Sequence, residues 1–183
     1  LMIDSNEIHC TKNAITFNAD VFANVEIERN TLSNTGTLPT MSQAKSEKVF
    51  TYGVYFNTIE GSININNNTM QNFFAGVYSV ASSNGSLGFI NSNTISNTNI
   101  GIAFEGGLYC NNIKISGNSI TGPLEGSGIN IPSISHENIQ SNIDISDNSI
   151  IGTNPAIIGY AGIYIENIYS NNLPNNQNIH LEM

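Results

Sequence analysis

A short motif returns almost unchanged along this chain, and its recurrence restricts the fold more than any other feature. NIKISGNSITG at 112–122 and NIDISDNSIIG at 142–152 are identical at eight of eleven positions. Weaker copies share the template apolar–x–apolar–x–x–Asn–x–apolar, and Gly88 is the one misfit at an apolar position. The template asparagines are Asn6, Asn30, Asn68, Asn93, Asn118 and Asn148, separated by 24, 38, 25, 25 and 30 residues. A period near 24 with insertions is typical of a solenoid.

A second repeated element follows each copy and begins with a small residue. These segments approximate small–apolar–x–apolar and occupy 14–17, 53–56, 76–79, 101–104, 128–131 and 162–165. Both elements alternate apolar and polar residues, which predicts short β-strands with one buried face and excludes helices in these segments. We expect copies of a strand to stack and their Ile residues to form internal columns. Each template Asn is expected at a sharp turn, in the left-handed conformation, with its amide in a ladder.

These repeated N-I-x-I-x-x-N-x-I segments resemble the right-handed parallel β-helix of the pectin-lyase-like superfamily. The resemblance covers nearly the whole chain and implies an all-β, single-stranded solenoid of six coils plus part of a seventh. It implies three sheets, with the Gly-Ile-x-Ile strand in the first, the I-x-I strand in the second and the strand after Asn in the third. We expect residues 1–183 to form one such domain, as a fragment of a longer chain, because no terminal cap is recognisable.

The charge balance argues against two classes of partner. The chain has a net charge of −9 and a single arginine, Arg29. Nucleic-acid phosphates and anionic membrane surfaces need Lys and Arg, so neither is an expected partner. No apolar run is long enough for membrane insertion. The two cysteines lack CxxC spacing and the chain has no HExxH, GxSxG or phosphate-binding loop, so no metal or other cofactor is expected.

The insertions between repeats all leave the solenoid at one edge, beside the expected first sheet. The gap from the template Asn to the small residue is eight residues in three coils, and it grows to 23 after Asn30, ten after Asn118 and 14 after Asn148. Long loops on one edge of a rigid scaffold commonly carry binding. In the resembled family this edge forms a polysaccharide groove, so we expect a polysaccharide or other glycan as partner.

The same alternation predicts which side chains face that groove. With Ile102 and Phe104 buried, Ala103 points outward, as do the candidate sugar-binding residues Tyr55, Asn57, Tyr78, Asn130 and Tyr164. Lys45 and Lys48 on the 34–52 insertion, and His136 on the opposite flank, complete the expected binding set. Tyr55 and Tyr78 lie on adjacent coils, so their rings could stack with each other or under a sugar. The alternative is that they are exposed strand aromatics that protect the sheet.

Three carboxylates are candidates for acid–base catalysis. Glu105 and Glu166 are expected two coils apart, about 10 Å, close to the roughly 6.5–9.5 Å separation in inverting glycosidases. Glu125, on the 122–127 insertion, could replace either partner. An exposed sheet face carries some Glu in any case, which is the structural alternative. Hydrolysis is favoured over a lyase reaction because the groove edge offers few cations to neutralise a uronate.

The sequence thus predicts a carbohydrate-binding β-helix of tailspike or secreted-depolymerase type, with polysaccharide cleavage as a further step. The alternative is a non-catalytic structural shaft or adhesin segment, and the sequence leaves the choice open. Either protein is expected to be extracellular, on a cell surface or on a virion. Homotrimer formation or flanking domains of a longer chain are the expected contacts beyond the glycan. An ice-binding solenoid is disfavoured because the outward row of the first sheet lacks ranked Thr.

Overall fold

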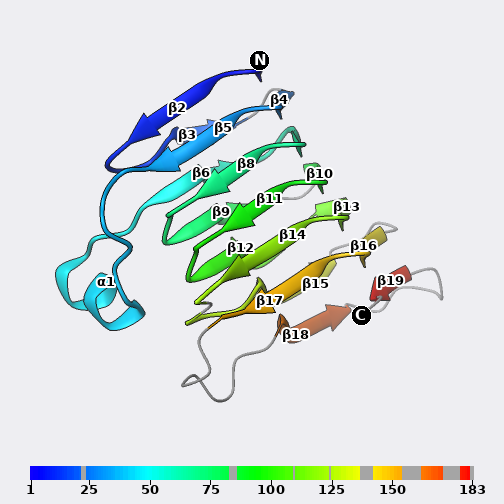
Figure 1. The fold of residues 1–183 in the computed structure, drawn as a ribbon. Helices are drawn as coiled ribbons and strands as arrows, with labels where there is room; N and C mark the ends of the chain where they lie inside the picture. Colours follow the sequence, from blue (N-terminus) through cyan, green and yellow to red (C-terminus); the bar gives the residue numbers. More distant parts are fainter. Residues whose placement is uncertain are drawn as a thin grey trace.

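Three parallel sheets account for almost all regular structure in the protein (Figure 1). The computed structural model describes residues 1–21, 24–82, 86–108, 110–123, 125–136, 142–153, 162–170 and 178–181. Sheet A contains β1 (Met2–Asp4), β4 (Val25–Glu28), β7 (Ser62–Asn66), β10 (Ser86–Asn91), β13 (Cys110–Ser116), β16 (Asn142–Ser146) and β19 (Asn178–Leu181). Sheet B contains β2 (Glu7–Cys10), β5 (Thr31–Asn34), β8 (Thr69–Gln71), β11 (Thr94–Ser96), β14 (Ser119–Gly122) and β17 (Ser149–Gly152). Sheet C contains β3 (Ile15–Val21), β6 (Tyr52–Ile59), β9 (Ala75–Ser82), β12 (Ile100–Phe104), β15 (Ile129–His136) and β18 (Ile163–Ser170).

The chain visits the sheets in the order A, B, C and then starts again, so each strand pairs with its repeat on the neighbouring turn or turns of the chain. This arrangement explains the repeated motif directly. Ile113 pairs with Ile143, and Ile120 pairs with Ile150 in the neighbouring sheet. Equal residues must stack because they occupy equal places in successive turns of the chain. The predicted all-β, solenoid-like arrangement with three sheets is confirmed.

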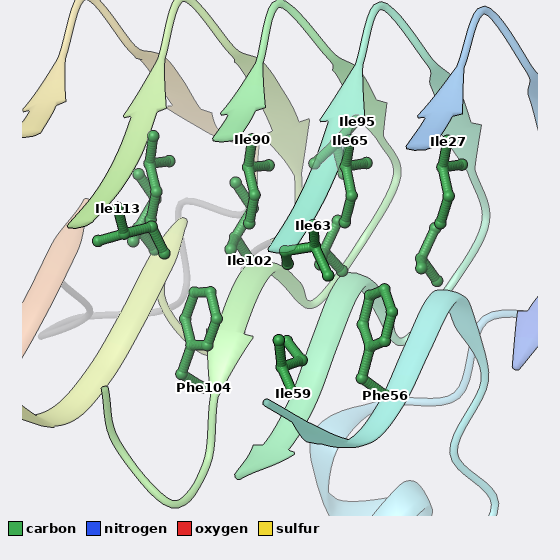
Figure 2. Close-up of a cluster of buried hydrophobic side chains, with 14 of the residues drawn as sticks. Ile27, Phe56, Ile59, Ile63, Ile65, Ile90, Ile95, Ile102, Phe104 and Ile113 are labelled. Atoms are coloured by element: carbon green, nitrogen blue, oxygen red, sulfur yellow. The ribbon is translucent and has the colours of Figure 1, made fainter. Parts of the chain in front are cut away.

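The core lies between the three sheets and consists of branched apolar columns. Figure 2 shows Ile27, Ile65 and Ile90 side by side in a row along sheet A, with Phe56 and Phe104 reaching toward them from sheet C. All five side chains are buried. Burying one such side chain stabilises the fold by roughly 1.5–3 kcal/mol, which makes these columns the main source of stability.

The predicted asparagine ladder is present and runs through the turns between sheets A and B. The Nδ2 atom of Asn68 donates to Oδ1 of Asn93 at 3.0 Å, and Asn93 repeats the bond to Asn118 at 3.0 Å. The same Oδ1 of Asn93 accepts the backbone N–H of Asn68 at 3.0 Å. Each side chain therefore ties two turns of the chain together in the interior.

The left-handed conformation was predicted one residue too late. It belongs to the residue before each ladder asparagine, and these residues have φ between 53 and 63°: Ser5, Arg29, Asn67, Ser92, Gly117 and Asp147. The ladder asparagines themselves are absent from the positive-φ residues. Their contribution is the buried amide, while the exposed residue before them makes the reversal in chain direction.

A column of glycines lies at the start of the strands of sheet C, where the backbones of neighbouring strands approach closely. A Cβ added at Gly101 would lie 2.4 Å from the carbonyl oxygen of Gly128, and one at Gly76 would lie 2.8 Å from that of Gly101. No side chain fits at those distances. The small residue at the start of the second repeated element is therefore a packing requirement.

The 34–52 insertion contains a helix that the sequence analysis did not predict. Helix α1 spans Met41–Glu47 and projects from the side of the stack (Figure 1). It begins with a capping box, in which Thr40 Oγ1 accepts from the Gln43 N–H at 3.2 Å and Gln43 Oε1 accepts from the Thr40 N–H at 3.0 Å. Lys48 follows the helix as its C-cap residue and has a left-handed φ of 54°. The local sequence signal was Thr40-x-x-Gln43.

Candidate functional site

A groove of about 720 Å³ lies between α1 and the outward face of sheet C. The walls come from the 34–52 insertion and from four successive strands, because parallel strands place equivalent residues in one row. Its lining comprises Met41, Lys45, Phe50, Tyr52, Tyr55, Phe74, Tyr78, Val80, Ile100, Ala103, Glu105, Asn130 and Pro132. Five of the predicted residues, Tyr55, Tyr78, Asn130, Lys45 and Glu105, thus meet in one place.

Helix α1 is held on the sheet by a small apolar cluster outside the main core. Ala44 packs with Phe74, Ala75, Ile100 and Ala103, and all five are buried. Ala103 was expected to face solvent. It does lie in the outward row, but the cluster under α1 leaves only 1% of it exposed. This apolar contact holds α1 against sheet C, where the helix forms one wall of the groove.

The 122–127 insertion anchors the beginning of the same helix. A carboxylate oxygen of Glu125, Oε2, accepts a hydrogen bond from the backbone N–H of Met41. Nearby, Nδ2 of Asn99 donates to the carbonyl oxygen of Pro39 at 2.6 Å. Glu125, a predicted catalytic candidate, therefore has a defined structural partner at the start of α1.

Three tyrosine rings form a continuous stack along the groove. The ring centroids of Tyr52 and Tyr78 are 4.5 Å apart, and those of Tyr52 and Tyr55 are 5.2 Å apart. Tyr55 and Tyr78 are nearly parallel, with 8° between their planes and 6.1 Å between their centroids. The predicted Tyr55–Tyr78 neighbours are thus present, with Tyr52 packed against both. Stacked rings of this kind present flat, partly apolar surface with hydroxyl groups at the edge.

Glu105 joins this stack through a hydrogen bond. The Tyr78 hydroxyl donates to Glu105 Oε2. Burial raises the pKa of Tyr52 to about 12, and the negative charge of Glu105 adds to the effect. Burial also raises the pKa of the Tyr78 hydroxyl, again with Glu105 as the second cause. Both phenols therefore stay protonated at neutral pH and can act as hydrogen-bond donors.

The remaining predicted residues lie outside the groove lining. Asn57 is in β6, opposite Val80, and Lys48 is the exposed residue that ends α1. Tyr164 is 41% exposed on β18, in register with Asn130. Glu166 is exposed on the same strand, beside Pro132 in the register of β15 and β18. His136 ends β15, and its side chain lies outside the described residues.

Sequence analysis missed several aromatic residues of the groove. Tyr52, Phe50 and Phe74 all line it, and Phe50 packs edge-to-face on Phe74 with centroids 4.9 Å apart. Tyr52 is the first residue of β6, and Phe50 and Phe74 precede β6 and β9, so strict alternation counted from the glycine onward assigns none of them an outward position. An aromatic residue within a few positions of the small residue was the available signal.

A second polar cluster lies on sheet B but is poorly placed for chemistry. His9 Nδ1 is within hydrogen-bonding distance of Ser33 Oγ, and His9 Nε2 is 3.0 Å from Glu7 Oε1. This order of groups resembles nucleophile, base and carboxylate. Ser33, however, is only 4% exposed, so its hydroxyl is not presented to a substrate.

The remaining charge features are structural. Lys114 Nζ forms an ion pair with Asp144 Oδ2 at 3.0 Å between neighbouring strands of sheet A. Among the described residues, no three His, Cys, Asp or Glu side chains gather to hold a metal ion. Within the same residues, no helix has the length and apolar character needed to cross a membrane.

Comparisons with protein-family models, with curated proteins and with solved structures give no match to this chain. The class of the protein therefore follows from its fold: an all-β protein of three parallel sheets with buried asparagines.

Proposed function

We propose that the groove between α1 and sheet C binds a polysaccharide, and that the protein is a right-handed parallel β-helix of the pectin-lyase-like superfamily, of tailspike or secreted-depolymerase type. The observation that carries the proposal is the gathering of the Tyr52–Tyr55–Tyr78 stack with Asn130 and Glu105 in one groove of about 720 Å³. Sugar rings have one apolar face and hydroxyl edges. Aromatic surface with a few fixed polar groups is the lining that suits such ligands.

Hydrolysis of the bound chain is a second proposed function. It is favoured by the position of two carboxylates, because Glu105 follows β12 and Glu166 lies on β18, with β15 between these strands. Two strand spacings amount to roughly 9.6 Å, at the upper end of the separation used for inversion. In this proposal Glu105 and Glu166 share the acid and base roles. Glu125 would first have to release the Met41 N–H.

The proposal also includes six to seven coils and action outside the cell or on a virion. Homotrimer formation or flanking domains of a longer chain are the further contacts that the proposal includes. The competing proposal is a structural shaft or adhesin segment, which the regular ladder also supports.

A glycan-array screen of the purified protein tests polysaccharide binding. We expect selective binding that is lost in the double variant Tyr55→Ala/Tyr78→Ala. Phe89→Ala is the matched control, because Phe89 is 37% exposed on sheet A, away from the groove. Reducing ends released from a bound glycan, and no longer released by Glu105→Gln, would support hydrolysis. Absence of binding by folded, monodisperse protein would favour the structural shaft.

A further inference from the structure

Glu105 is an exposed carboxylate in the groove, and only one of its oxygens has a hydrogen-bond partner among the described residues. The Tyr78 hydroxyl donates to its Oε2, and its backbone N–H donates to the Ser79 carbonyl oxygen at 2.9 Å. No described residue donates to Oε1, and none forms an ion pair with this carboxylate. Lys45 is the cation among the described lining residues, yet it does not pair with Glu105. The groove thus holds one negative charge without a positive partner.

The groove beside Tyr78 and Glu105 is lined by Val80 and Pro132, which are both partly exposed. Tyr78 stacks on Tyr52 at 4.5 Å, and its register partner on the next strand is Ala103, whose side chain ends at Cβ. Asn130 follows Ala103 in the same row. Aromatic residues therefore occupy two strands of the row, and small or amide side chains occupy the next two. Ala103 itself is covered by α1, so a sugar that contacts Tyr78 and lies next to Glu105 would sit over Val80 and Pro132.

We propose that the sugar bound beside Tyr78 is an amino sugar with a free, protonated amine, and that its ammonium donates to Glu105 Oε1. This inference rests on the proposed polysaccharide-binding function and names the substrate class. An aromatic ring and a carboxylate side by side are the two groups that attract an ammonium ion. The net charge of −9 also favours a cationic polymer and repels uronates. Lys45, on α1, donates to hydroxyl groups of an adjacent sugar.

Calorimetric titration with three tetrasaccharides separates this inference from general carbohydrate binding. The ligands are β-1,4-linked tetramers of glucosamine, N-acetylglucosamine and glucose, which differ only in the substituent at C2. At pH 5.5, where the free amine is charged, we expect the glucosamine tetramer to bind roughly tenfold or more tightly than the other two. Equal or tighter binding of either uncharged tetramer would overturn the inference.

The matched variants are Glu105→Gln and Glu26→Gln. Glutamine keeps an acceptor for the Tyr78 hydroxyl, so Glu105→Gln should fold and should lose the preference for the charged tetramer. Glu26 is an exposed carboxylate of β4 on sheet A, and its variant should bind as the wild type does. If Glu105→Gln keeps the preference, the ammonium lies elsewhere and the inference is wrong. If none of the three tetramers binds, the inference is also wrong, and the glycan array decides whether the groove binds carbohydrate at all.

Discussion

Replacing one ladder asparagine, Asn93→Ala, should remove a large part of the stability of the fold. Asn93 is 1% exposed, and its side chain serves two neighbouring turns of the chain. Its Oδ1 accepts from the backbone N–H and from Nδ2 of Asn68, each at 3.0 Å. Its Nδ2 lies within hydrogen-bonding distance of the Ile65 carbonyl at 2.8 Å, the Asn91 carbonyl at 3.1 Å and Asn118 Oδ1 at 3.0 Å.

The expected cost follows from the groups left behind. The buried N–H of Asn68 loses its acceptor, which costs about 1–3 kcal/mol, and about three further hydrogen bonds are lost at roughly 1 kcal/mol each. We therefore expect a loss near 5 kcal/mol, which compares with a total stability of about 5–15 kcal/mol for a typical domain. Asn6→Ala is the control within the same ladder. It removes two bonds of an exposed side chain, to Asp4 and Asn30, and should cost about 1 kcal/mol or less.

Urea unfolding followed by far-ultraviolet circular dichroism measures both losses. Equal slopes for the two variants and the wild type would show that midpoints can be compared as stabilities. If Asn93→Ala costs no more than Asn6→Ala, the amides of the ladder are replaceable by water. A buried N–H without an acceptor would then cost less than the expected penalty of about 1–3 kcal/mol, which would refute the prediction.

Two further predictions concern the glycines and the buried tyrosines. Gly101→Ala should lower stability by about 3 kcal/mol, because its Cβ would lie 2.4 Å from the Gly128 carbonyl oxygen. Gly88→Ala is the control: its nearest contact would be 3.4 Å, so it should be neutral or stabilising by up to about 1 kcal/mol. Thermal unfolding distinguishes the two variants, and similar losses of stability at both sites would contradict the prediction. For Tyr52, the folded-state pKa of about 12 exceeds the ordinary value of 10.0, so above pH 10 the unfolded chain loses this proton first and stability falls until about pH 12. Tyr52→Phe should reduce the loss of stability between pH 9 and 11.5, and an unchanged loss would assign it to other groups.

The fold was largely predictable because each turn of the chain repeats the same local chemistry. Ile113 and Ile143 are equivalent in sequence and are paired in space, so the period directly indicated the stacking. The left-handed turn position was harder to predict. Residues as different as Arg29 and Gly117 occupy it, since its side chain is exposed and carries no compositional signal.

The groove was only partly predictable because alternation fails at its edge. Gly53 and Val54 are both buried, so Tyr52 faces outward together with Tyr55 although simple alternation places them on opposite faces. One wall of the groove is α1, a helix of seven residues. Its Ala44 packs against Ile100, which is far away in the sequence. Such long-range support leaves no periodic trace in the sequence.

The exposed left-handed residues before the ladder asparagines have a practical consequence. Ser5, Arg29, Asn67, Ser92, Gly117 and Asp147 point to solvent, and five residue types are accepted there. Successive members of this row lie in neighbouring turns between sheets A and B, roughly 4.8 Å apart. Labels, cross-linkers or charges can therefore be introduced at regular intervals along this edge without altering the interior. Pairs of such labels would allow distances and tension to be measured along the stack.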